Sequence, residues 1–308
     1  MPDHDVLSAG DRVLLAQERS LGDAGADSGH CRRARVGDIA APSSGRPFES
    51  RSSAIPAPKK VTPEKVLQSF NTWHFKREQP ADPHLMLQII SEAIGRREPV
   101  PFVLYWGKGP RCTLGEPDTE CLDFLAALAD RVRDAYEPGA AIKLIFTDTH
   151  AELNGHAQQS IRKYFAEVEA GARQRGFDAC RLGQLIRASE AVAANDLDDE
   201  DVPQDTLQRL SAGARKWYHG AGTAEQGALI YYRMNMVERR AVEIAFPRSI
   251  FVTFNGSKFR GLFPKHLPIF FMYSLRRGVS VKPWFLPADA TPCDDSSCHC
   301  VTHWSRAS

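Results

Sequence analysis

The segment AIKLIFTD, from Ala141 to Asp148, decides the fold class expected for this chain. It is a short apolar run that stops at a polar residue, as a buried β-strand does. The run PVPFVLYW, residues 99–106, precedes it, and FDACRLGQL, residues 177–185, follows it. Amphipathic helical patterns at residues 118–136 and 156–177 separate the three runs. This alternation predicts a parallel sheet covered by helices.

Helix-start signals support this reading upstream. Thr62 followed by Pro63, and Asp82 followed by Pro83, each predict a capped helix with proline in its first turn. Apolar residues at helical spacing then predict a buried stripe on the segment after residue 118, formed by Leu122, Leu125, Leu128 and Val132.

The second half of the chain predicts two more helices, at residues 206–220 and 225–246. They are followed by apolar, β-like runs at 249–256 and 267–275, and then by the segment at 279–285. We expect the late pair of runs to form antiparallel strands at an edge of the sheet. The expected fold class is therefore α/β: a Rossmann-like, mostly parallel sheet flanked by helices, with late C-terminal edge strands.

Composition narrows the class of protein. The 308 residues include 43% hydrophobic and 25% charged residues, which is typical of a globular protein. A net charge of +1 argues against general attraction to nucleic acid or anionic membrane, and no apolar run has the length of a membrane span. The N-terminal residues lack the basic and apolar regions of a secretory signal, and seven scattered cysteines suggest reduced thiols. We therefore expect a cytoplasmic protein; its oligomeric state is open.

Three regions are expected along the chain. Residues 1–58 are rich in Gly, Ser, Ala, Arg and Pro and are predicted to be disordered. Residues 59–288 are predicted to form a single Rossmann-like catalytic domain. Residues 289–308 are predicted to be a flexible tail. The tail carries soft ligands suited to zinc, namely Cys293, Cys298, Cys300 and His303. The paired CxxC layout of zinc sites is missing, however, and chain ends are seldom ordered.

The loop GKGPRCTLGEPD, residues 107–118, follows the first predicted strand. Lys108 and Arg111 lie beside glycine and proline, so the loop suits a phosphate or a carboxylate. The spacing of a P-loop and of a dinucleotide-binding GxGxxG motif is absent. A solvated turn is the alternative.

A second polar segment follows the strand at residues 141–148. Asp148 and His150 suit acid/base catalysis, because histidine titrates near neutrality and a carboxylate can orient it. Asn154 and His156 are candidates for substrate binding. Metal binding by Asp148, His150 and His156 is possible but lacks a known ligand spacing, and a simple capping loop is the third alternative.

Two later segments carry further cations. Residues 231–243 predict a helix whose charged residues, Arg233, Glu238, Arg239 and Arg240, form a solvated face with internal ion pairs. Residues 255–261 add Lys258 and Arg260 after a strand, a weak anion-binding candidate.

The two strand-end loops together resemble the pyoverdine/dityrosine-biosynthesis family of isocyanide (isonitrile) synthases. The resemblance covers about residues 65–185. Lys108 matches a family lysine, and Asp148 matches the family's strand-end aspartate. Between them, Leu114, Gly115, Pro117 and Asp118 match an LGxxPD segment, and Tyr136, Pro138 and Gly139 match a YxPG turn. The family's Asp-Gly is replaced here by Asp148-Thr149-His150, so the chain resembles a divergent branch.

The resemblance implies a Rossmann-like enzyme that converts the amino group of an amino acid into an isonitrile. The carbon comes from ribulose 5-phosphate, and neither a metal nor a redox cofactor is required. Lys108 and Arg111 would bind the phosphate, Asp148 the substrate amine, and His150 would move protons. Arg239, Lys258 or Arg260 would hold the carboxylate.

Two other functions remain open. A cyclodipeptide-synthase-like enzyme would use aminoacyl-tRNA, but the strand-end loops lack an obvious nucleophilic serine. A non-catalytic protein that binds a small ligand would use these loops as anion-binding sites and would not require acid/base groups. The expected partners are small molecules, an amino acid and a sugar phosphate.

Overall fold

The computed structural model describes residues 61–107, 112–189, 202–218 and 222–272, except for the side chains of Lys216, Trp217, Lys258 and Phe259. The chain divides into two units, Met1–Lys59 and Lys60–Ser308, and every described residue belongs to the second. The predicted N-terminal extension, the segment at 279–285 and the Cys/His tail lie outside the described residues.

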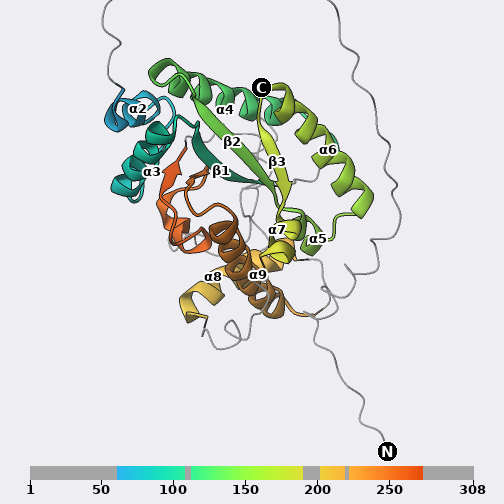
Figure 1. Ribbon diagram of the computed structural model, residues 1–308. Helices are drawn as coiled ribbons and strands as arrows, with labels where there is room; N and C mark the ends of the chain where they lie inside the picture. The colour runs from blue at the N-terminus through green and yellow to red at the C-terminus, as the bar shows by residue number, and fades with distance from the viewer. Residues whose placement is uncertain (1–60, 108–111, 190–201, 219–221, 273–308) are drawn as a thin grey trace, which may run out of the picture. The chain divides into compact units, whose positions relative to one another are not determined.

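The described part of the chain is built on a five-stranded parallel sheet (Figure 1). Its strand order is β3-β2-β1-β4-β5. The strands are β1 Val100–Trp106, β2 Ala140–Phe146, β3 Asp178–Arg181, β4 Ile250–Thr253 and β5 Ile269–Phe271. The predicted α/β, Rossmann-like fold class is confirmed.

The predicted orientation of the late strands is wrong. β4 pairs in parallel with β1, inside the sheet, and β5 pairs in parallel with β4 at the edge. A parallel pair needs a crossover of about a dozen residues or more, and residues 254–268 provide one. Their backbone includes the short 3₁₀ helix η1, Ser257–Leu262. Apolar runs alone do not reveal strand direction, so the antiparallel expectation had no support in the pattern itself.

The helices lie on the predicted segments, with one addition. They are α2 Pro63–Phe70, α3 Pro83–Arg96, α4 Glu116–Ala135, α5 Asp148–Leu153, α6 Gln158–Gln174, α7 Leu182–Ala188, α8 Gln204–Trp217 and α9 Ala224–Ala245. Thr62 caps α2 as predicted, accepting the backbone N–H of Lys65 at 3.4 Å. Asp82 precedes α3 but its side chain makes no capping hydrogen bond; it lies 3.6 Å from Arg260 instead.

Alternate residues along the strands bury their side chains on opposite faces of the sheet. On one face, Phe102, Leu104 and Trp106 of β1 pack in a core with residues of α2, α3, α4 and α6. The predicted stripe Leu122, Leu125, Leu128 and Val132 of α4 is fully buried in this core. On the other face, Val103 and Ile145 pack against α7 and α9. The sheet is therefore covered on both sides, as in doubly wound folds.

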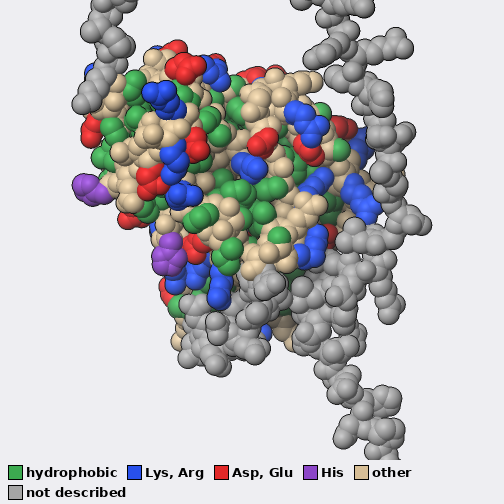
Figure 2. All heavy atoms as spheres, viewed as in Figure 1, with side chains coloured by type: hydrophobic (Ala, Val, Ile, Leu, Met, Phe, Trp, Pro, Cys, Tyr) green, Lys and Arg blue, Asp and Glu red, His purple; other side chains and the backbone are tan. Residues whose placement is uncertain are grey.

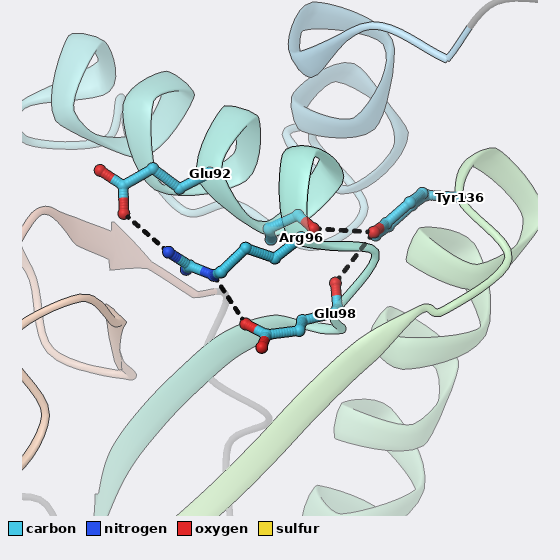
Figure 3. Close-up of polar contacts among 5 residues, drawn as sticks. Glu92, Arg96, Glu98 and Tyr136 are labelled. Atoms are coloured by element: carbon cyan, nitrogen blue, oxygen red, sulfur yellow. Dashed lines mark hydrogen bonds and ion pairs between the residues drawn. The ribbon is translucent and has the colours of Figure 1, made fainter.

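The YxPG turn closes the amino edge of the sheet. The hydroxyl of Tyr136 lies 3.0 Å from the carbonyl oxygens of both Ala93 and Glu98, which joins the end of α4 to the end of α3 (Figure 3). Gly139 adopts a φ of 72°, a conformation that favours glycine, and its carbonyl accepts the N–H of Val100. This motif therefore supports the start of β1 and β2, opposite the predicted site.

The described surface has a mixed charge pattern. Figure 2 shows acidic and basic side chains interspersed over the face in view, in keeping with a net charge of +1. Among the described helices, none has both the length and the apolar character to cross a membrane.

Candidate functional site

The candidate site begins where β2 leaves the sheet. The backbone N–H of Thr147 still donates to the carbonyl of Trp106 at 3.0 Å, so the chain remains beside β1. Residues 148–153 then form α5, where the sequence suggested a loop. Asn154 caps the C-terminus of α5, and Gly155, with a φ of 72°, follows it. The polar residues of this segment are thus held on a short helix at the carboxyl edge, where ligands bind in open α/β sheets.

His150 of α5 contacts a buried carboxylate on α9. Its Nε2 lies 2.5 Å from Oε2 of Glu238, and the hydroxyl of Thr149 donates to Oε1 at 2.7 Å. Because an ionised carboxylate only accepts hydrogen bonds, the ring donates through Nε2. The Glu238 side chain is 0% exposed and that of His150 is 9% exposed. A buried charge is tolerated only when it is paired in this way. Loss of this contact between α5 and α9 would therefore strongly destabilise the fold.

The interpretation of Glu238 as part of a solvated face was wrong. Tyr231, Asn235, Glu238 and Val242 are all buried and are spaced by four, three and four residues, so they form one inward face of α9. Arg233 and Arg240, in contrast, are exposed as predicted. The spacing was visible in the sequence, but three neighbouring arginines suggested a surface position for Glu238.

Two tyrosines lie close to this contact, Tyr231 through ring packing and Tyr105 through its electrostatic interaction with Glu238. The ring of Tyr231 packs edge-on against His150, with centroids 5.2 Å apart and an interplanar angle of 89°. Burial, followed by the charge of Glu238, raises the pKa of Tyr231 and of Tyr105 well above the ordinary value of tyrosine. Both phenols therefore stay protonated over the physiological range.

Asp148 points to a different neighbour. Its Oδ1 accepts the backbone N–H of Gly183, the second residue of α7, at 3.0 Å. Burial raises the pKa of Asp148, while the Gly183 N–H and the charge of Arg181 oppose the shift. A carboxyl group with a raised pKa exchanges its proton at higher pH than an exposed aspartate, which suits acid/base chemistry.

Asp148 and His150 do not form the pair that the sequence suggested. Residues two apart on a helix do not face each other, and here the two side chains contact different helices, α7 and α9. The carboxylate that orients His150 is Glu238, 88 residues further along the chain.

The other candidate residues that the structure describes either follow α5 directly or form hydrogen bonds that support the backbone. Asn154 and His156 follow α5, and their backbone N–H groups donate to His150 and Ala151 carbonyls. Arg239 donates to the carbonyl of Gly261 at 3.1 Å. The guanidinium of Arg260 donates to the carbonyls of Pro264 and Lys265. Both arginines therefore support the η1 region.

Several candidates cannot be placed. Lys108 and Arg111 lie outside the described residues, as does the tail with Cys293, Cys298, Cys300 and His303, and the side chain of Lys258 is not described. Over the ranges that are described, no group of three or more His, Cys, Asp or Glu side chains is arranged to hold a metal ion.

The LGxxPD segment has a structural explanation. Asp118 is buried at the start of α4, where its Oδ2 accepts the N–H of Gly115 at 2.9 Å. Its Oδ1 accepts the hydroxyl of Tyr164 at 3.0 Å, and that hydroxyl accepts the indole N–H of Trp106 at 3.2 Å. This chain of bonds connects α4, α6 and the carboxyl end of β1, so it holds the frame of the site.

Comparisons with known proteins place the fold. No family model and no curated protein matches the sequence. Among solved structures, the PvcA protein from Pseudomonas aeruginosa is similar with a TM-score of 0.50 and 18% identity, over 72% of this chain and 87% of PvcA. Tyrosyl-tRNA synthetase from Archaeoglobus fulgidus, complexed with L-tyrosine, has a TM-score of 0.40 and 13% identity over 74% of this chain and 70% of the synthetase. The PvcA match shows a shared fold.

Proposed function

We propose that this chain is an enzyme that modifies the amino group of an amino acid, with chemistry like that of isonitrile synthases. The observation that carries the proposal is the buried His150–Glu238 pair next to Asp148 at the carboxyl edge of the sheet. The motif resemblance and the fold shared with PvcA, of the pyoverdine/isonitrile synthase family, support a distant relationship.

The pair provides a proton-transfer group in a fixed orientation. Glu238 holds Nε2 of His150, so the ring presents Nδ1, which has no hydrogen-bond partner among the described residues. Orienting a histidine through a buried carboxylate fixes its tautomer and stabilises the imidazolium that forms when it accepts a proton. His150 therefore acts as the acid and base in the steps that form an imine and cleave a carbon–carbon bond.

Asp148 serves the substrate amine. Its carboxylate holds an ammonium group and then takes a proton from it, releasing the neutral amine that attacks a carbonyl carbon. Its raised pKa brings proton exchange closer to neutrality. Lys108 and Arg111, outside the described residues, are the expected ligands for the phosphate of a pentulose phosphate.

The direct test is product formation. The purified 308-residue chain is incubated with L-tyrosine or L-tryptophan and ribulose 5-phosphate, and isonitrile is detected by its infrared stretch and by mass spectrometry. The expected result is product with at least one of the two amino acids. An absence of product with all twenty amino acids contradicts the proposal.

Matched variants connect the activity to the site. His150→Gln and Glu238→Gln are expected to lower kcat by about 10²-fold or more, the usual loss when a general acid or base is removed. His84→Gln on α3 is the control, because His84 is exposed and lies outside the site. Unchanged kcat in His150→Gln assigns the pair a purely structural role.

A further inference from the structure

We propose that Arg181 binds the α-carboxylate of the substrate, so that Asp148 and Arg181 together select a zwitterionic α-amino acid. This inference rests on the proposed function and names a residue that the sequence patterns did not indicate.

Arg181 is placed at the site by the register of the sheet. It is the last residue of β3 and pairs with Phe146, the last residue of β2, so both strands end side by side. Asp148 follows Phe146 by two residues, and Gly183, which donates to Asp148, follows Arg181 by two. The cation and the carboxyl group therefore project from adjacent strand ends.

The guanidinium of Arg181 is held by aromatic rings. Its Cζ lies 4.8 Å from the ring centre of Phe165 and 5.2 Å from that of Phe146. These two rings are themselves stacked, with centroids 4.7 Å apart and an interplanar angle of 20°. Both phenylalanines are buried in the core, so the arginine rests on a rigid support. A preorganised guanidinium loses little conformational entropy when it binds an anion.

The hydrogen-bonding groups of Arg181 remain available. Within the described residues its guanidinium donates no hydrogen bond and forms no ion pair, although the residue is half-buried. Aromatic rings attract the cation but leave its N–H donors without acceptors. Arg239 and Arg260, the earlier candidates for the carboxylate, already donate to backbone carbonyls. Arg181 is therefore better suited to a carboxylate ligand.

Asp148 and Arg181 complement the two charges of an amino acid. They influence each other electrostatically, yet they form no ion pair with one another. An α-amino acid has its ammonium and carboxylate on one carbon atom, so it can bridge two such groups. The ammonium binds Asp148 and the carboxylate binds the planar fork of Arg181.

The test compares ligands with and without a carboxylate. Calorimetry measures the binding of L-tyrosine, L-tryptophan, tyramine and tryptamine to the 308-residue chain. Wild type is expected to bind an amino acid more tightly than its amine. Arg181→Met, which keeps an apolar side chain on the rings, is expected to weaken amino-acid binding by about 10- to 100-fold and to leave amine binding unchanged.

Arg131→Met is the matched control. Arg131 is exposed near the end of α4, at the opposite edge of the sheet, so its replacement should alter neither affinity. Wild-type affinity of Arg181→Met for the amino acids overturns the assignment, even if isonitrile forms. Arg181-dependent binding without any isonitrile supports the assignment and contradicts the proposed reaction. Failure of all twenty amino acids to bind overturns both.

Discussion

Replacing Glu238 by alanine is expected to destabilise the native state by about 3–5 kcal/mol, the usual cost of removing one partner of a buried charged contact. The contacts account for this size. The Thr149 hydroxyl loses a hydrogen bond worth about 1 kcal/mol, and the His150 ring loses a charge-assisted bond worth about 1.5–3 kcal/mol. Loss of one buried methylene group, Cγ, adds about 0.8 kcal/mol. Typical stabilities are about 5–15 kcal/mol, so the effect is large.

Equilibrium unfolding in urea, followed by circular dichroism, measures this loss. Glu238→Gln is expected to cost less, about 1–2 kcal/mol, because the amide oxygen still accepts one of the two hydrogen bonds. Glu92→Ala is the control: it removes a partly exposed ion pair with Arg96 and an exposed hydrogen bond from Gln88, both on α3, so we expect a cost below about 0.5 kcal/mol.

A double-mutant cycle with His150→Ala isolates the contact itself. We expect a coupling energy of about 1–3 kcal/mol between the two positions, as for directly bonded neighbours. If Glu238→Ala costs less than about 1 kcal/mol and shows no coupling to His150, then the carboxylate is solvated and the reasoning about α9 is wrong.

Three further predictions concern the frame of the site. Because burial raises the native pKa of Asp148 above its ordinary value of 3.8, its contribution to stability is greatest below that value and is lost as the pH rises through the native pKa; Asp148→Asn should remove this part of the pH dependence of urea unfolding. In Gly183→Ala the new Cβ would lie 3.3 Å from Oδ2 of Asp148, so kcat should fall by about tenfold or more. In the control Gly95→Ala on α3, the new Cβ meets no atom within 4 Å, so thermal unfolding should show a fold more stable by about 0.5–1 kcal/mol. Asp118→Ala should cost about 2–3 kcal/mol in urea unfolding, because it leaves buried donors, including the hydroxyl of Tyr164, without their acceptor; a cost near zero would mean that water replaces the carboxylate.

Local patterns in the sequence were sufficient for the secondary structure of the core. The apolar runs that form β1 and β2, and the stripe on α4, are where the spacing predicted them. Period-two and period-3.6 burial is a property of a strand or helix by itself, so it can be recognised before the neighbours are known. The position of Asp148 at a strand end follows from the same reasoning.

The orientation of β4 and β5 and the partner of His150 were decided by the tertiary structure. Both depend on which distant segments lie side by side, and that is set by the total packing of the sheet with α7 and α9. Glu238 lies among arginines in the sequence, and only the rotation of α9 against the sheet buries it beside α5. Arg181 likewise appears ordinary until β3 is paired with β2. The sequence alone determined the strands, all the described helices except α5, and a strand-end aspartate, whereas the charged groups that accompany that aspartate are brought beside it by long-range contacts.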